Sequence, residues 1–203
     1  MNFKEDIILE DEVALLRPLQ ATDFDNLLEY SVNEPEIWQY STRGADGSEK
    51  LKRYIETTIK QRELEKEYPF IVFDKRKGKY IGSTRFYDIN TENKSLLLGY
   101  TWYGKAYQGT GINKHCKYLL LQYAFEKLGM ERVEFRANNN NKKSINAMQS
   151  IGCKVEGILR NYGTDTQGKR YDAIVLSIIK SEWETEVKKA LHLKLAATDS
   201  QII

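Results

Sequence analysis

The segment with the clearest chemical potential joins a predicted strand to a predicted amphipathic helix and reads Tyr107-Gln-Gly-Thr-Gly-Ile-Asn-Lys114. The first N–H groups of a helix have no intrahelical acceptor, and the helix dipole is positive there. Gly109 and Gly111 have no Cβ, so an anion can approach the main chain closely. Lys114 falls in the first turn, where its charge opposes the dipole unless it faces a bound anion. The spacing indicates an anion-binding loop; a glycine-rich connection without a ligand is the alternative.

Two nucleotide-binding motifs can be compared with this loop directly. A P-loop has the pattern Gly-x-x-x-x-Gly-Lys-Ser/Thr; Gly104 and Gly109 have that spacing, but Thr110 occupies the lysine position. A dinucleotide-binding fingerprint has the pattern Gly-x-Gly-x-x-Gly, and Lys114 occupies the position of its third glycine. The sequence therefore excludes both motifs here.

The composition excludes further classes of protein. Among 203 residues, 31 are Lys or Arg and 29 are Asp or Glu, giving a net charge of +2 with both signs mixed along the chain. Proteins that wrap a phosphate backbone have a larger and more clustered basic excess, so nucleic acid is not an expected partner. No apolar run approaches the roughly 18 residues of a membrane span, and the first residues lack a signal-peptide pattern. We expect a cytoplasmic globular protein without membrane contact.

The two cysteines, Cys116 and Cys153, show neither metal-ligand spacing nor a disulfide framework, so we expect reduced thiols and no metal. Cys116 lies near the predicted helix N-terminus, which can lower a thiol pKa, and a nucleophilic role is the alternative to core packing. However, it falls on the apolar stripe of the helix, and its neighbour His115 points in a different direction. The pattern favours core packing for Cys116.

Hydrophobic periodicity alternates between strand and helix along the chain. Four segments have a helix pattern. Two of them begin near residues 22 and 48, and the other two cover about residues 112–129 and 141–151. Strand patterns cover about residues 12–19, 69–73, 79–87, 95–102, 132–137, 154–160 and 171–179. This order predicts one α/β (α+β) domain with a mixed, mostly antiparallel central sheet.

Several segments in chain order resemble one family. Gln108-Gly-Thr-Gly-Ile-Asn113 resembles the acetyl-CoA motif Gln/Arg-x-x-Gly-x-Gly/Ala of the GNAT superfamily of N-acetyltransferases, with Asn113 in place of Gly or Ala. Further pieces resemble successive segments of its RimJ/RimL-like branch: Leu16-Arg-Pro-Leu19, Gly99-Tyr-Thr-Trp102, Asn141-x-x-Ser144 with Ser150-Ile-Gly152, and Glu156-Gly-Ile-Leu-Arg160 with Gly168-Lys-Arg-Tyr-Asp172. The resemblance covers a domain at about residues 10–183, and residues 184–203 form a C-terminal helical tail.

The resemblance implies a definite geometry. Helices would cover both faces of the sheet, and the fourth and fifth predicted strands (95–102 and 132–137) would splay apart. The pantetheine arm of acetyl-CoA would lie in the gap like an extra strand, with its pyrophosphate on the main chain of the glycine loop. The implied cofactor-binding residues are Tyr100, Thr101, Trp102, Gln108, Gly109, Thr110, Gly111, Ile112, Asn113, Lys114, Asn141 and Ser144.

Acetyl transfer from a thioester to an amine requires a deprotonated amine, a polarised carbonyl group, a protonated leaving thiolate and alignment of the reactants. A backbone N–H near residues 99–101 would polarise the carbonyl group. The resemblance points to Ser144 as the catalytic acid, with Tyr162 or another tyrosine as an alternative. Many relatives carry a glutamate two residues before the fourth-strand glycine, where this chain has Leu97. Asp88, Glu92 or a water chain could replace it, or an amine of low pKa could arrive neutral, so the base stays unassigned.

The expected function is transfer of an acetyl group from acetyl-CoA to a primary amine, on a protein N-terminus or a small molecule. Transfer would be direct, in a ternary complex. Because Leu97 replaces the glutamate, a non-catalytic acyl-CoA-binding module is the alternative. Relatives suggest a monomer or a homodimer.

Overall fold

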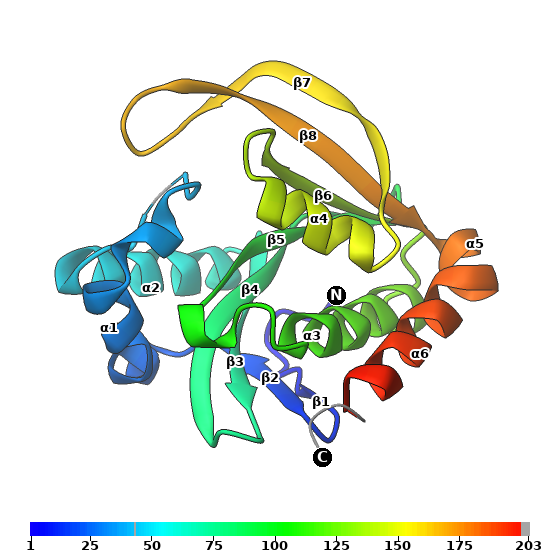
Figure 1. The fold of residues 1–203 in the computed structure, drawn as a ribbon, viewed down its shortest axis with the longest axis horizontal. Helices are drawn as coiled ribbons and strands as arrows, with labels where there is room; N and C mark the ends of the chain where they lie inside the picture. The colour runs from blue at the N-terminus through cyan, green and yellow to red at the C-terminus, as the bar shows by residue number, and fades with distance from the viewer. Residues whose placement is uncertain (43, 200–203) are drawn as a thin grey trace.

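The computed structural model describes residues 1–42 and 44–199. Within these residues eight strands form one sheet in the order β1-β2-β3-β4-β5-β6-β8-β7 (Figure 1). Only β5 and β6 are parallel; every other neighbouring pair in this described sheet is antiparallel. The strands are β1 (Leu9–Glu10), β2 (Ala14–Pro18), β3 (Glu67–Asp74), β4 (Lys79–Asn90), β5 (Ser95–Tyr103), β6 (Arg132–Asn138), β7 (Lys154–Thr164) and β8 (Arg170–Ile179). The predicted mixed, mostly antiparallel sheet is confirmed.

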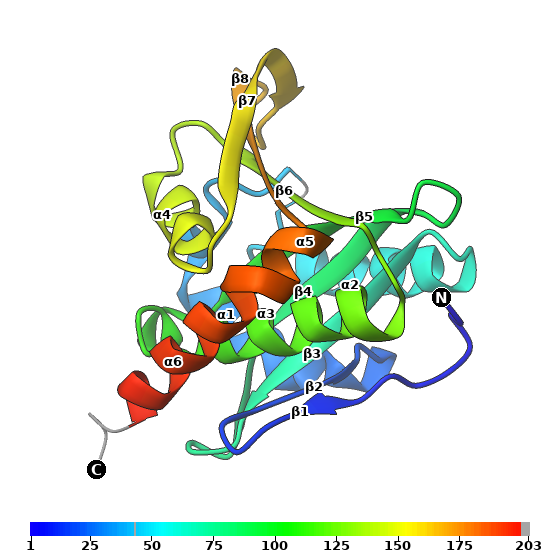
Figure 2. The ribbon, with the colours of Figure 1, turned by 90° about the vertical axis from the view of Figure 1, so that its right-hand side faces the viewer.

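Helices cover both faces of this sheet (Figures 1 and 2). On β3, Phe70 and Val72 join the core with α3, whereas Ile71 between them joins a second core with α1 and α2. Alternate residues of a strand point to opposite faces, so the two cores lie on opposite sides of the sheet. The helices are α1 (Phe24–Asn33), α2 (Ser48–Glu63), α3 (Ile112–Gln122), α4 (Lys142–Ser150), α5 (Lys180–Glu182) and α6 (Lys188–Asp199).

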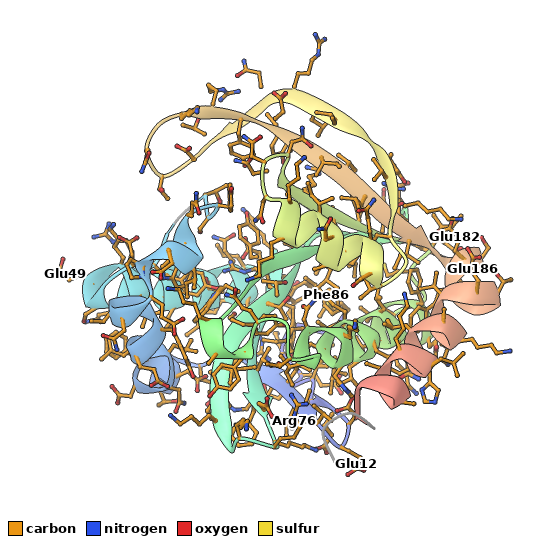
Figure 3. The ribbon with its side chains drawn as sticks, viewed as in Figure 1. Glu12, Glu49, Arg76, Phe86, Glu182 and Glu186 are labelled. Carbon is orange, nitrogen blue, oxygen red and sulfur yellow. The ribbon has the colours of Figure 1, made fainter. Side chains whose placement is uncertain are left out.

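The larger core lies between the sheet and α3. Figure 3 shows Phe86 of β4 in the interior, whereas Glu12, Glu49 and Glu186 lie at the periphery. Phe86 is fully buried and packs edge-on against Phe70, with ring centroids 5.6 Å apart. Among the described residues no helix has the length and apolarity needed to cross a membrane.

The fourth and fifth predicted strands correspond to β5 and β6, because the short β1 precedes them. Their ladder consists of the pairs Ser95↔Arg132, Leu96↔Val133 and Leu97↔Glu134. The strands nevertheless continue to Tyr103 and Asn138. The predicted splay is therefore confirmed, and it begins immediately after Leu97.

A β-bulge lies in β5 just beyond the point of parting. The register with β4 shifts between Ser83 and Arg85, so that Tyr100 and Thr101 face the single residue Thr84. The φ angle of Tyr100 is +49°, in the left-handed region that costs a non-glycine residue free energy. A bulge increases the local twist of its strand, which turns the end of β5 away from β6.

The C-terminal segment packs against α3 and the short π-helical turn Tyr123–Lys127 that continues it. The indole ring of Trp183 is 1% exposed and stacks on Phe125, with centroids 5.6 Å apart, and its Nε1 donates to Glu126 at 2.9 Å. Leu191 of α6 joins the same core. Of the expected tail, residues 184–199 are helical, and residues 200–203 lie outside the described residues.

This packing predicts that the C-terminal segment stabilises the domain. Replacing Trp183 by Ala should lower the free energy of unfolding by about 3–5 kcal/mol, because a large buried side chain is lost. Urea unfolding followed by far-UV circular dichroism measures the change. The control is Leu193→Ala in α6, where the side chain is 60% exposed and we expect a change within about 0.5 kcal/mol. Equal stabilities of the two variants would contradict the prediction.

Candidate functional site

The glycine loop ends at an open helix N-terminus. Gly109 and Gly111 have φ angles of +81° and +91°, which glycine adopts without the steric cost paid by other residues. Gly111 is the N-cap of α3, and no described side chain accepts a hydrogen bond from the first turn. Ile112 is fully buried and anchors that turn to the core. The N–H groups of Ile112 and Asn113 are therefore held in place and left available to a ligand, whereas that of Lys114 donates to the Gly111 carbonyl oxygen at 2.8 Å.

The side chains of the loop hold its shape. Gln108 Nε2 donates to the carbonyl oxygen of Tyr103 at 2.8 Å, and Thr110 Oγ1 donates to that of Tyr107 at 2.8 Å. Asn113 Oδ1 accepts from the Tyr103 hydroxyl at 3.3 Å. These side chains are engaged within the protein, so what the loop offers an anion is chiefly its main chain.

Two lysines bring positive charge to the loop. Lys114 in the first turn of α3 is half-buried and forms no ion pair among the described residues. Lys143 of α4 donates to Gln108 Oε1. The sequence analysis missed Lys143, although it occupies the first turn of a helix, the same unfavourable position that drew attention to Lys114.

The second predicted segment begins α4. Asn141 is the N-cap of this helix, and its Oδ1 accepts from the backbone N–H of Ser144 at 3.1 Å. Ser144 is half-buried, and its hydroxyl group forms no hydrogen bond among the described residues. The Lys143–Gln108 contact brings this segment beside the glycine loop, from 35 residues away in the sequence.

The bulge sends neighbouring side chains to opposite faces. The ring of Tyr100 lies 4.8 Å from that of Tyr87 on the α2 face, whereas Thr101 faces α3. Trp102 is buried in the second core, where its ring lies 4.6 Å from that of Trp38. The side chain of Trp102 is therefore part of the second core. Unlike its two neighbours, it can offer a cofactor only its main chain.

Tyrosine rings flank the gap on the α2 face, and two glycines make room for them. A Cβ at Gly99 would lie 3.1 Å from the ring of Tyr87, and one at Gly163 would lie 2.7 Å from the Tyr171 hydroxyl oxygen. The rings of Tyr162 and Tyr171 lie 6.3 Å apart on the β7–β8 hairpin. Burial raises the pKa of Tyr87 well above its usual range, so it stays neutral.

A carboxylate does lie beside Leu97, but on the neighbouring strand. Glu134 pairs with Leu97 in register, and it accepts from Arg132 Nη2 at 2.8 Å and from Arg136 Nε at 2.7 Å. Arg136 Nη1 in turn donates to the Tyr162 hydroxyl at 2.8 Å. Two guanidinium groups thus engage the oxygens of Glu134, which positions Arg136.

The candidate nucleophile and the two candidate bases differ in their exposure to solvent. Cys116 is fully buried in the main core, and burial raises its pKa to about 12, so it is a packed thiol and not a nucleophile. Asp88 and Glu92 are both exposed. No cluster of three or more His, Cys, Asp or Glu side chains that could hold a metal occurs in the described part of the chain.

Comparison with known proteins decides the family. Residues 14–154 match the acetyltransferase (GNAT) domain. The chain belongs to the GNAT acetyltransferase family. YdaF of Bacillus subtilis, named as a candidate ribosomal N-acetyltransferase, is similar to this chain: it is 33% identical over 109 residues (54% of this chain, 58% of YdaF). The uncharacterized N-acetyltransferase p20 of Bacillus licheniformis is 27% identical over 176 residues (86% of this chain, 97% of p20).

Solved structures agree with this assignment. A GCN5-related N-acetyltransferase from Brucella melitensis superposes with a TM-score of 0.86 at 25% identity, covering 94% of this chain and 86% of the other. The ribosomal-protein-S5-alanine acetyltransferase of Vibrio fischeri shares the fold, with a TM-score of 0.72 at 20% identity (88% of this chain, 99% of the other). The protein is therefore an acetyltransferase by family.

The cap of α4 gives a prediction for the site. Asn141→Ala should lower the free energy of unfolding by about 1 kcal/mol, because the Ser144 N–H loses its acceptor. Asn141→Asp keeps an acceptor oxygen and should stay within about 0.5 kcal/mol of the wild type. Urea unfolding of the three proteins checks this, and an Ala variant as stable as the wild type would show that the cap does not fix the start of α4.

Proposed function

We propose that this protein transfers an acetyl group from acetyl-CoA to a primary amine, directly and within a ternary complex. The observation that carries the proposal is the gap between β5 and β6, which opens toward the C-terminal ends of two parallel strands. The glycine loop follows the end of β5, and the N-terminus of α4 follows the end of β6. Parallel strands end at the same edge of a sheet, so both anion-binding and capping segments flank the open end of the gap.

The residues present fit the parts of acetyl-CoA. The N–H groups from Gly109 to Asn113, with the ammonium groups of Lys114 and Lys143, suit its phosphates, whereas the Lys114 N–H donates to the Gly111 carbonyl oxygen at 2.8 Å. Beyond Leu97 the facing edges of β5 and β6 suit the amide groups of its pantetheine arm. Acetyl-CoA supplies an acyl group already activated as a thioester.

The chain's own groups would then act on that thioester. Main-chain N–H groups at the Tyr100–Thr101 bulge donate to the carbonyl oxygen, and the Ser144 hydroxyl protonates the sulfur. The amine approaches from the α2 face, between the tyrosine pairs of β4–β5 and β7–β8. Leu97 offers no carboxylate, so the amine loses its proton to water.

The acceptor is a primary amine of a protein N-terminus or of a small molecule. The names of YdaF and of the Vibrio fischeri enzyme refer to ribosomal proteins. Peptides that carry free N-termini are therefore the first acceptors to screen, followed by polyamines and amino sugars.

Calorimetric titration of acetyl-CoA into the full chain tests the cofactor site. We expect binding of acetyl-CoA and desulfo-CoA but not of ATP. Release of free thiol across the amine panel then tests transfer. Absence of acetyl-CoA binding to folded protein would overturn the proposal, and binding without turnover would instead fit a non-catalytic acyl-CoA-binding module.

Ser144→Ala should separate chemistry from binding. We expect kcat to fall by about a hundredfold, in the range for loss of a general acid, while the Kd for acetyl-CoA changes less than about twofold. Thiol release with the best acceptor and calorimetry give the two values. The matched control is Ser150→Ala at the end of the same helix, where Oγ donates to the Ala147 carbonyl oxygen, and kcat should be unchanged. An unchanged kcat in Ser144→Ala would remove this hydroxyl from the mechanism.

A further inference from the structure

A buried ammonium group lies directly beneath the bulge. Lys117, on the second turn of α3, is 4% exposed. Its Nζ donates to Thr101 Oγ1 at 2.7 Å and to Thr84 Oγ1 at 3.3 Å, and no described carboxylate lies within ion-pair distance of it. Lysines are almost never fully buried unless they are paired with an opposite charge. The burial of Lys117 without a carboxylate partner is therefore not explained by the stability of the fold.

The charge of Lys117 is not balanced by its surroundings. Its titratable neighbours are Cys116 on α3 and Cys153 before β7, and burial raises the pKa of both thiols to about 12. On the opposite face of β4, the buried guanidinium group of Arg85 pairs with Glu67 at 2.5 Å. Burial lowers the pKa of Lys117 to about 8, so the ammonium form still dominates at pH 7.

The hydroxyl groups connect this ammonium to the bulge. Thr101 Oγ1 lies 2.8 Å from Thr84 Oγ1, which donates to the Gly99 carbonyl oxygen at 3.4 Å. An ammonium group has three protons, and the two threonines accept two of them. One proton of Lys117 therefore has no acceptor among the described residues.

We propose that Lys117 stabilises the negative charge that develops on the thioester at the bulge, acting across Thr101 as a positioning residue. This inference rests on the acetyl-CoA site proposed above. It explains why an unpaired cation is kept at the start of the gap, since a fixed charge in a dry site favours an anion that forms nearby. The sequence contains the signal, because Lys117 falls three and four residues before the buried Leu120 and Leu121.

The electrons in the transfer move toward this charge. The amine nitrogen bonds to the carbonyl carbon, and the π electron pair moves onto the carbonyl oxygen. When that pair returns, the C–S bond breaks and its electron pair leaves on sulfur. The proton lost by the amine passes to water, and the thiolate takes a proton from Ser144, which regains one from water. Oxygen and then sulfur therefore carry the negative charge.

The test uses CoA, whose thiolate is the leaving group, and needs no acceptor. The full chain is saturated with CoA, and the ultraviolet absorbance of the thiolate is followed against pH, with the desulfo-CoA complex as the reference. The reference cancels tyrosine absorbance, and the two cysteines stay protonated below about pH 10. Because Lys117 itself loses its charge above about pH 8, the comparison is made at pH 7, where we expect the thiolate fraction of the bound CoA to be at least about tenfold larger in the wild type than in Lys117→Met.

Matched variants separate charge from structure. Lys117→Arg keeps the charge and should retain most of the effect, whereas Thr101→Val removes the connecting hydroxyl and should lose part of it. Lys127→Met, at an exposed lysine beyond α3, should titrate like the wild type. If Lys117→Met does not fold, Thr101→Val provides the comparison.

The outcomes distinguish the two proposals. Equal thiol titrations in the wild type, Lys117→Met and Thr101→Val, with CoA bound in all, would overturn the role of Lys117 and leave the cofactor site standing. Folded wild-type protein that binds no CoA would overturn both.

Discussion

The early end of the β5–β6 ladder is the constraint on which the rest of the site depends. Both strands remain anchored on their outer edges: β5 pairs with β4, and β6 pairs with β8 along the whole length of β6. Their inner edges beyond Leu97 and Glu134 have no ladder with each other. Main-chain polar groups at a buried edge cost free energy unless they find partners. These edges without a ladder are the feature on which the proposed pantetheine site rests.

The separation of β5 and β6 also determines which segments lie together at the open end of the gap. Because β5 and β6 are parallel, the loop before α3 and the cap of α4 lie at the same edge of the sheet. The contact between Lys143 and Gln108 closes this edge, and Asn141 holds the first turn of α4. The main-chain N–H groups at the start of α3 and the hydroxyl group of Ser144 thereby lie at the same edge of the sheet, which is the alignment that the proposed acyl transfer needs.

The treatment of charge differs between the scaffold and the bulge. In the scaffold, buried charges are paired, as in Arg17 with Asp23 at 2.6 Å and Arg85 with Glu67. Pairing limits the desolvation cost of a buried ion. The ammonium group of Lys117 at the bulge contacts only neutral hydroxyl groups among the described residues. Burying such a cation lowers the free energy of unfolding. Under the proposed function, the same cation would stabilise the anion that develops during the reaction.

Features that depend on local physics could be predicted from the amino-acid sequence alone. The glycine loop, the start of α2 at Ser48 and the order of strands and helices follow from backbone freedom and hydrophobic periodicity. Contacts between distant segments could not be predicted in this way: the structure was needed to see that Lys117 contacts Thr84, that Lys143 contacts Gln108, and that Glu134 lies beside Leu97. The two hydrogen bonds span 33 and 35 residues. Such contacts depend on strand register and on how helices pack. Hydrophobic periodicity shows which face of a helix or strand is buried, but it does not show which residues lie against that face.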